Sequence, residues 1–544
     1  MFSHLSSAAG LSPLTFLDGC VLLSTWSGAL SALDVKERKL TGADYDFFFS
    51  SSLFTIKQGD GPEHLTTHIL ISGKAAMDLL LPYAIGDFSV LIEGDAFTLL
   101  LYDENEALQM ALNWTSAEER INRVDSDFPP ALIAVSCGVV SVEDDCIVSL
   151  WNQTIFSSVT QKTERFSSLH CISAKGILFG VEEEEAVHVR YLPYGLSEPH
   201  DIGGDGVNCV GALMDISRNQ IIVTEEVSGQ HRLRFYDSTS CCLKSISDKL
   251  FGSITPIHTG DDVLYYASGS IEGIQLLKQD FSLLACFLPG LAAHRRRYTE
   301  YADVKVTSIE SSQKAVLNVV FLHGGPESCE WDTPRHYPLL KSLENHSVNF
   351  HIVNYPGSAG FGRKFRSIAD QQVCEFTSTA VVNWIKAHLP SQPTVLMGWS
   401  FGGTLALEIL GLCEKKDINT VGVAIINPLL DLPFHLNRVA ENKGDLSFFR
   451  RKFSRKDCDA VSVGRYKNLI KNSNARILLI AGRNDEVLSS DSAQDLINRL
   501  GSSENVSFVL DDGAHGGAES FDAREDRLIA FVKQFLPLAL NNHQ

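Results

Sequence analysis

The sequence predicts two domains of different class: a β-propeller of about seven blades over residues 1–295, and an α/β domain with a mostly parallel sheet over residues 296–544. Three observations lead to this prediction. The 544 residues exceed what one ordinary hydrophobic core accommodates. Residues 14–281 are a succession of short β runs with little helical periodicity. From about residue 297 onward, apolar strand-like runs alternate with helical patterns.

The propeller prediction depends on the spacing of turn signals in the first half of the chain. They precede the β runs at steps near multiples of roughly 40 residues, and a period of about 40 to 45 residues with four strands is typical of a propeller blade. An irregular β sandwich is the alternative. The signals are Asp18-Gly19, Gly59-Asp60 (a weaker member), Gly94-Asp95, Cys137-Gly138, Lys175-Gly176, Arg218-Asn219 and Gly260-Asp261.

An acidic run at residues 182–185 interrupts this first half. One interpretation is a solvated hairpin tip, because like charges avoid burial. The other is an acidic pair that binds the amino terminus of a substrate. Glu225-Glu226 is a similar but less specific signal.

In the second half, buried-type strands are predicted at 316–322, 350–353, 421–426, 477–480 and 506–510, and an amphipathic helix at 524–536. Strands that alternate with helices favour a parallel sheet covered on both faces. In such sheets ligands bind at the carboxyl ends of the strands. Candidate functional residues are therefore expected at those ends.

The stretch Gly398-Trp399-Ser400-Phe401-Gly402 follows an apolar run and precedes a helix-compatible segment. Gly-x-Ser-x-Gly at a strand-to-helix turn is the nucleophile-elbow pattern, in which a strained serine projects from the sheet. The two glycines are needed where strand and helix pass too close for a Cβ. This context predicts that Ser400 is a catalytic nucleophile.

Partners for Ser400 are predicted at two later strand ends. Asp485 follows the strand at 477–480, and His515 follows the strand at 506–510 between glycine-containing segments. The order Ser, Asp, His is that of α/β-hydrolases, with His515 as general base and Asp485 as the residue that orients it. Asp511 and Asp512 are the competing carboxylates, and Asp485 is preferred because they share the loop of the histidine.

The segment His323-Gly324-Gly325-Pro326 ends the strand that should neighbour the nucleophile strand. Glycines there allow backbone amides to face a reacting carbonyl. We therefore assign the oxyanion hole to the amides of Gly325 and Phe401.

Composition narrows the function classes. The net charge of −20 and the few basic clusters, Arg295-Arg296-Arg297 and residues 450–456, predict no nucleic-acid partner, and both clusters are expected to be solvated surface. No apolar run has the length of a membrane span, and no Lys or Arg precedes Lys36, so neither a membrane segment nor a signal peptide is expected. The 12 scattered cysteines suit a reducing, cytoplasmic location. No metal-ligand spacing stands out and no cofactor is expected.

These motifs together resemble the prolyl oligopeptidase family, and within it the acylaminoacyl-peptidase-like branch. The resemblance spans residues 316–517. It implies a propeller that covers an α/β-hydrolase, a serine peptidase activity on short peptides, and restricted access to the nucleophile. The motifs that carry it are His323-Gly324-Gly325-Pro326, the stretch at 354–362, Gly398-Trp399-Ser400-Phe401-Gly402-Gly403 and the loops of Asp485 and His515.

The chain departs from the family pattern in three places. Pro356 stands where the family has Arg in its Asn-Tyr-Arg-Gly-Ser stretch, and the connection from the first domain to His323 is short. Val487 stands two residues after Asp485, where many members carry an Arg that holds a substrate carbonyl. The resemblance thus implies substrate contacts at Tyr355 and at the position of Val487, with Arg483 as a substitute donor.

The sequence therefore predicts a serine hydrolase that cleaves amide bonds of short peptides through an acyl-enzyme, with no cofactor. The alternative is a specialised amidase or esterase acting on a peptide-like natural product or its precursor. A non-catalytic binding protein that uses the propeller face is less favoured because every catalytic position is filled. The oligomeric state is left open, with a homo-oligomer among the alternatives.

Overall fold

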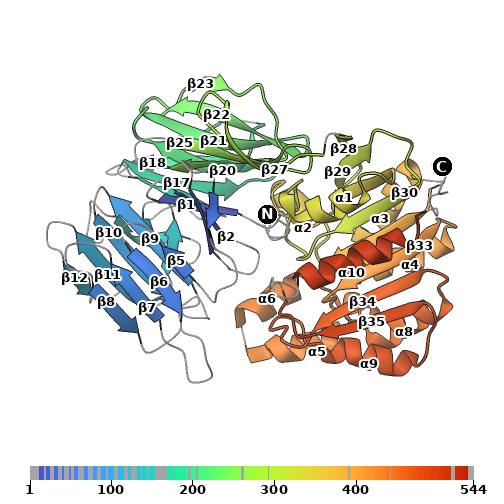
Figure 1. Ribbon diagram of the computed structural model, residues 1–544. Coiled ribbons are helices and arrows are strands. Elements are labelled where there is room, and N and C mark those ends of the chain that lie inside the picture. Colours follow the sequence, from blue (N-terminus) through green and yellow to red (C-terminus); the bar gives the residue numbers. More distant parts are fainter. Residues whose placement is uncertain are drawn as a thin grey trace, which may run out of the picture.

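The computed structural model describes residues 168–536, except 174, 194–197, 204–205, 259–262, 292, 390–391, 442 and 516–520, together with the backbone of strands between residues 12 and 152. Turn signals 18–19, 59–60, 94–95 and 260–261, and residues 516–517 of the histidine loop, lie outside the described residues. Figure 1 shows antiparallel sheets from the first half of the chain beside an α/β unit built from the second half.

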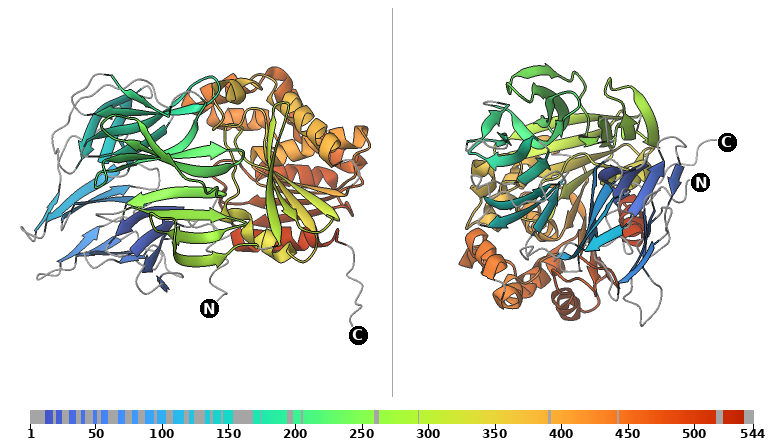
Figure 2. Two further views of the ribbon diagram at one scale, coloured as in Figure 1. Left: turned by 90° about the horizontal axis from the view of Figure 1, so that it is seen from above. Right: turned by 90° about the vertical axis from the view of Figure 1, so that its left-hand side faces the viewer.

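The described strands up to residue 289 form seven antiparallel sheets, and each sheet is made of strands consecutive in the sequence (Figures 1 and 2). The first four sheets are β1 (Ser12–Leu17), β2 (Cys20–Ser24), β3 (Leu30–Asp34) and β4 (Lys39–Thr41); β5 (Phe48–Ser50), β6 (Phe54–Gln58), β7 (Thr67–Ile71) and β8 (Met77–Leu81); β9 (Asp87–Glu93), β10 (Ala96–Tyr102), β11 (Leu108–Thr115) and β12 (Arg120–Arg123); and β13 (Leu132–Val135), β14 (Gly138–Glu143) and β15 (Cys146–Asn152).

The other three sheets are described with their side chains in most positions. They are β16 (Ser168–Ile172), β17 (Gly176–Glu182), β18 (Val187–Pro193) and β19 (His200–Ile202); β20 (Asn208–Asp215), β21 (Gln220–Val227), β22 (Gln230–Asp237) and β23 (Leu243–Ile246); and β24 (Ser253–His258), β25 (Val263–Gly269), β26 (Gly273–Leu277) and β27 (Leu283–Pro289). Central strands such as β21 and β25 are rich in buried β-branched and aromatic residues, which suit a pleated surface covered on both sides.

The second half contains an eight-stranded sheet in the order β28-β29-β31-β30-β32-β33-β34-β35. The pairs from β31 to β35 are parallel, and β28 and β29 add an antiparallel edge. The strands are β28 (His294–Tyr301), β29 (Val304–Ser311), β30 (Leu317–Leu322), β31 (Val348–Asn354), β32 (Thr394–Trp399), β33 (Thr420–Ile426), β34 (Arg476–Gly482) and β35 (Val506–Asp511).

Helices cover both faces of this sheet. They are α1 (Tyr337–Leu343), α2 (Arg363–Ser367), α3 (Val373–His388), α4 (Phe401–Lys415), α5 (Leu432–Arg438), α6 (Lys443–Lys452), α7 (Arg455–Ala460), α8 (Val463–Asn472), α9 (Asp491–Leu500) and α10 (Phe521–Lys533), with short 3-10 turns η2 (Pro334–His336) and η3 (Val439–Glu441).

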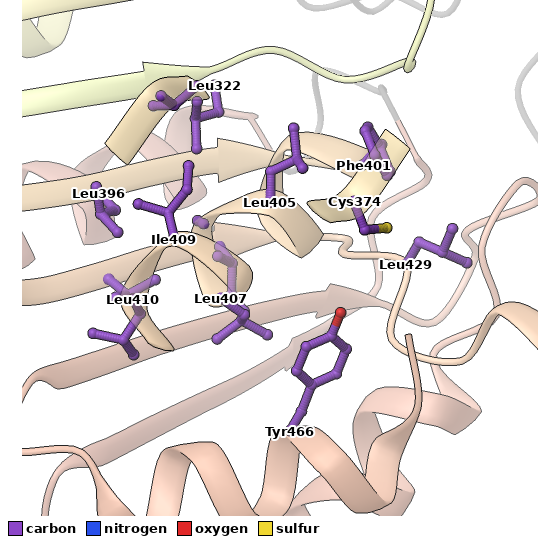
Figure 3. Close-up of a cluster of buried hydrophobic side chains, with 14 of the residues drawn as sticks. Leu322, Cys374, Leu396, Phe401, Leu405, Leu407, Ile409, Leu410, Leu429 and Tyr466 are labelled. Atoms are coloured by element: carbon purple, nitrogen blue, oxygen red, sulfur yellow. The ribbon is translucent and has the colours of Figure 1, made fainter. Parts of the chain in front are cut away.

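Alternate residues of the central strands enter two different hydrophobic cores. On β30, Val320 and Leu322 pack with α3, α4, α8 and α9, whereas Val319 and Phe321 pack with α1 and α10. This period of two is what a strand buried on both faces requires. Figure 3 shows the first core, where Leu405, Ile409 and Leu410 of α4 meet Leu322 and Leu396 of the sheet. The sheet is therefore a rigid platform for the loops at its strand ends.

Candidate active site

The Ser400 backbone has the strained conformation expected of a nucleophile elbow. Ser400 lies between the end of β32 and the start of α4, with φ 55° and ψ −126°. A Cβ on Gly398 would lie 2.2 Å from the carbonyl oxygen of Gly402, and a Cβ on Gly402 would lie 2.1 Å from that of Leu322. The Ser400 N–H donates to the carbonyl of Ile426 on β33 at 2.9 Å. Such strain costs about 1–3 kcal/mol and persists only where packing on all sides enforces it.

Asp485 and His515 are joined by a hydrogen bond. His515 Nδ1 lies 2.7 Å from Asp485 Oδ2, and the Asp485 side chain is 1% exposed. The other carboxylate oxygen accepts the N–H groups of Val487 at 2.9 Å and Leu488 at 2.6 Å. Because Nδ1 donates to the carboxylate, Nε2 is the basic nitrogen of the neutral ring. The carboxylate is thus fixed by its own loop and in turn fixes the imidazole.

The competing carboxylates are used elsewhere. Asp512 accepts from Arg483 Nη1 at 2.5 Å, and both side chains are largely exposed. Asp511 forms a bidentate pair with Arg524 of α10, with N–O distances of 2.7 Å and 2.6 Å. These contacts stabilise the histidine loop, and they direct both carboxylates to arginines instead of to the imidazole.

The loop after β30 lies against the nucleophile. A Cβ on Gly324 would lie 3.2 Å from Ser400 Cβ and 3.8 Å from Ser400 Oγ. The Gly324 carbonyl accepts from Tyr355 Oη at 3.0 Å and from His323 Nδ1 at 2.6 Å. In a trans peptide the carbonyl and the following N–H point in opposite directions, so these bonds fix the direction of the Gly325 N–H. Gly325 itself has φ 125°, which glycine tolerates.

His323 is held neutral. Burial lowers its pKa to about 4, and the hydrogen bond with Gly324 opposes that shift only in part. In the neutral ring Nδ1–H donates to Gly324, and Nε2 lies 2.8 Å from Ser358 Oγ, whose hydroxyl also donates to the Tyr355 carbonyl at 2.7 Å. Its ring stacks on Tyr355 with centroids 4.2 Å apart. The histidine is therefore a support of the loop that carries Gly325.

The three predicted substrate contacts have different surroundings. Tyr355 is completely buried, and its hydroxyl also donates to the carbonyl of His323 at 2.8 Å, so its contacts are with the Gly325 loop. Arg483 is paired with Asp512, as described above. Val487 is 47% exposed on the Asp485 loop. Phe401 is buried at the first position of α4, where a helix leaves its N–H groups without intrahelical partners.

Sequence reasoning missed Asn427, which links the loops of Asp485 and His515. Its amide oxygen accepts from Gly482 N, and its amide nitrogen donates to the carbonyls of Ala514 and His515. The available signal was its position directly after the apolar strand at 421–426, at the carboxyl end of the sheet. Arg524 of α10 was also missed, and only the fold brings it to the loop.

The acidic run at residues 182–185 contacts helix α2, a contact that neither sequence interpretation included. Arg363 pairs with Glu184 at 2.6 Å, Lys364 pairs with Glu185 at 2.7 Å, and Arg366 pairs with Glu182. The main chains also meet, because Arg363 N donates to the Glu183 carbonyl at 2.6 Å. The run is therefore part of a contact between the two halves of the chain. Glu225, from the second acidic pair, is buried against Arg232 and Arg234.

The prediction that both basic clusters are solvated surface is wrong for two residues. The Arg296 side chain is 6% exposed between Glu272 and Asp332, and the Lys452 side chain is 1% exposed beside Glu327 and Asp370. Carboxylates from distant segments make these burials possible, because a buried cation requires a paired anion. The pairing could not be read from the local sequence.

Within the described part of the chain, no group of His, Cys, Asp and Glu side chains is arranged to hold a metal ion. Among the described helices, none combines the length and the apolar character needed to cross a membrane.

Comparisons with known proteins agree with this architecture. Residues 319–524 match the alpha/beta hydrolase family, so this part of the chain is an α/β-hydrolase domain. The fold resembles a puromycin-hydrolyzing peptidase of Mycobacterium tuberculosis (TM-score 0.67, 13% identity, covering 97% of this chain and 95% of that chain). It also resembles an acylaminoacyl peptidase of Pyrococcus horikoshii (TM-score 0.67, 13% identity, 98% and 97% covered). A puromycin hydrolase complexed with PGG gives a TM-score of 0.69 at 11% identity, with 97% and 95% covered.

These neighbours share the fold of this chain, and one of them is an acylaminoacyl peptidase, in agreement with the resemblance that the motifs indicated. No curated protein matched the sequence.

Proposed function

We propose that this protein is a serine hydrolase that cleaves amide bonds of short peptides through an acyl-enzyme. The observation that carries the proposal is the strained Ser400 elbow, which lies against Gly324 at the same sheet edge as the Asp485–His515 pair. Structures of similar fold are described as a puromycin-hydrolyzing peptidase and an acylaminoacyl peptidase, which supports a peptide-like substrate.

The mechanism assigns one role to each group. His515 Nε2 takes the Ser400 hydroxyl proton as Oγ bonds to the substrate carbonyl carbon. The N–H groups of Gly325 and Phe401 stabilise the oxyanion that forms. Collapse of this intermediate breaks the C–N bond, and His515 returns the proton to the leaving amine. Water, deprotonated by the same imidazole, then releases the acid from Ser400.

The architecture proposed for this function is a seven-bladed propeller (residues 1–295) that restricts access to an α/β-hydrolase domain (residues 296–544). The seven successive antiparallel sheets and the contact of the 182–185 run with α2 support it. We further propose a cytoplasmic location, no cofactor and no nucleic-acid or membrane partner.

Covalent labelling tests the nucleophile. A fluorophosphonate should label Ser400, and Ser400→Ala should lose both labelling and turnover without unfolding. Ser312→Ala is a matched control, because Ser312 is exposed just after β29, at the opposite edge of the sheet. Turnover by Ser400→Ala at the wild-type rate would refute the mechanism.

A second candidate, a specialised amidase or esterase, is favoured by the exposed Val487. A cation there could have held a peptide carbonyl through a charge-assisted hydrogen bond, worth roughly 1.5–3 kcal/mol. Without it, generic extended peptides should be poor substrates unless Arg483 leaves Asp512 to supply the donor.

Substrate size and type separate the two candidates. A short aminoacyl or dipeptidyl chromogenic substrate should be cleaved, and casein should not. Efficient cleavage of many ordinary peptides, undiminished in Arg483→Ala, would eliminate the specialised enzyme. Turnover confined to activated esters or a few amides would eliminate the general peptidase.

A further inference from the structure

Asn427 occupies a special position between the two loops that carry the proposed acid and base. It directly follows β33, which lies between the nucleophile strand β32 and the acid strand β34. Asn427 is 3% exposed, and its backbone N–H donates to the Ile480 carbonyl at 2.9 Å. The backbone has φ 44°, a region that Asn enters more readily than most residues other than Gly.

The side chain of Asn427 uses both ends of its amide. Its Oδ1 accepts from Gly482 N at 2.9 Å, three residues before Asp485. Its Nδ2 donates to the Ala514 carbonyl at 3.2 Å and to the His515 carbonyl at 3.0 Å. Two carbonyls need donors and one N–H needs an acceptor, so the partners define the orientation of the amide. One buried side chain therefore ties the start of the Asp485 loop to His515 itself.

In the described part of the histidine loop, two further contacts reach the main chain of Ala514 and His515. Arg524 Nη1 also donates to the Ala514 carbonyl at 3.2 Å, and Glu486 Oε2 lies 3.4 Å from the His515 N–H. Gly513 lies two residues before His515 in the sequence, and a glycine leaves the backbone more conformational freedom than other residues do. A general base that is displaced by about 1 Å can lose on the order of 100-fold in rate.

We propose that Asn427 is a positioning residue that holds His515 in register with Asp485 and Ser400. It acts through the main chain of His515 and does not touch the substrate. The inference rests on the proposed function for its catalytic consequence, but the restraint on the loop can be measured independently.

Two substitutions separate the contributions of the side chain. Asn427→Gly removes the amide and accepts the positive φ without strain. Asn427→Asp keeps an acceptor for Gly482 N but cannot donate to the Ala514 and His515 carbonyls. Asn505→Asp is the matched control, because Asn505 also donates to two carbonyls, those of Ser473 (3.0 Å) and Ala475 (3.2 Å), before β34 at the opposite sheet edge.

The expected result is a fall in kcat of about 10- to 100-fold in both Asn427 variants, with KM within about threefold of wild type. Hydrogen–deuterium exchange of the segment that contains residues 511–515 should rise in both, and in Asn505→Asp neither kcat nor that exchange should change. Rates are expressed per site labelled by fluorophosphonate, so that a loss of folded protein does not count as a loss of kcat.

Unchanged exchange and unchanged kcat per labelled site in Asn427→Asp would overturn the inference. If wild-type protein neither turned over substrate nor reacted with fluorophosphonate, the proposed function would fail. The exchange measurement would still decide whether Asn427 restrains the His515 loop.

Discussion

Asp485 is bonded to His515 across 2.7 Å, whereas Asp512, only three residues before His515, is bonded to Arg483. Proximity in the sequence therefore does not select the acid. The Asp485 loop follows β34 and the histidine loop follows the adjacent parallel strand β35, so the sheet brings the two loops together. The Asp512 side chain lies on the histidine loop and is largely exposed to solvent.

This arrangement predicts different effects for the two carboxylates. Asp485→Asn should lower kcat by about 10⁴-fold, the scale reported for loss of the orienting acid in such triads, because the imidazole loses its tautomer control. Asp512→Asn should change kcat little, since it removes an exposed ion pair worth at most about 1 kcal/mol. Steady-state kinetics on a short chromogenic substrate measures both. A large loss with Asp512→Asn and none with Asp485→Asn would assign the acid to Asp512.

The close approach of backbone segments at the elbow predicts a specific stability defect. A Cβ on Gly402 would lie 2.1 Å from the Leu322 carbonyl oxygen and 2.3 Å from that of His323, so Gly402→Ala should unfold the domain or displace the Gly325 loop. Gly464→Ala is the control, because a Cβ at this position of α8 meets nothing within 4 Å. It should stabilise the helix by roughly 0.5–1 kcal/mol.

Thermal unfolding and fluorophosphonate labelling of the two glycine variants check this prediction. A Gly402→Ala protein with wild-type stability and labelling rate would show that strand and helix can separate at no cost.

The ion pairs between the 182–185 run and α2 predict a salt-sensitive contact between the two halves of the chain. Arg363→Glu places a negative charge beside Glu184, so access of longer peptides to Ser400 should increase severalfold relative to a dipeptidyl substrate. The double variant Arg363→Glu with Glu184→Arg, which swaps the two charges, should restore the wild-type ratio of turnover of longer peptides to turnover of the dipeptidyl substrate. The ratio is measured at low and high salt, because screening weakens exposed pairs.

The same ratio in wild type, single variant and swap would show that this contact does not limit access. A single-variant effect that persists unchanged at high salt would point to a packing defect instead of lost charge attraction.

The buried histidine of β31 predicts how stability changes with pH. Burial, assisted by Arg297 and His388, lowers the pKa of His351 to about 3, and its ring is hydrogen-bonded to Ser308 and Asn318. The pKa of His351 in the folded protein lies below the ordinary histidine value of 6.5, so the unfolded chain binds the proton more readily. The contribution of His351 to the free energy of unfolding is therefore fully present above about pH 6.5. It is lost as pH falls toward 3, by up to about 1.4 kcal/mol per pH unit.

Urea unfolding at pH 7 and pH 5 measures this dependence. His351→Gln should show a smaller loss between the two pH values than wild type does, although His323 and His231, whose pKa values burial also lowers, still contribute. An identical loss in the variant would mean that His351 is not the titrating group.

Much of the fold followed from local patterns. The strand-helix alternation after residue 297 predicted the parallel sheet, because buried strands and amphipathic helices have different hydrophobic periods. The elbow was predictable at Ser400, since steric limits allow that turn only with small neighbours. The blade count remains a prediction, supported by seven successive sheets in the described chain.

Contacts between segments far apart in the chain were not predictable in the same way. Nothing near Arg296 or Lys452 reveals that Asp332 and Asp370 will neutralise them, and nothing near residues 182–185 reveals helix α2. A charged run considered alone is predicted to be exposed, because burying unpaired charges is costly. The oppositely charged residues that offset this cost lie elsewhere in the chain and cannot be identified from the local sequence.

The sequence by itself determined the residue types and their order along the chain: a serine in an elbow, then an aspartate and a histidine after later strands. Only the tertiary structure decided which carboxylate meets His515, that Tyr355 and His323 support the Gly325 loop, and that Asn427 joins the acid and base loops. The physical reason is that hydrogen bonds are short-ranged and directional, so their partners are defined only when the sheet register brings strand ends together.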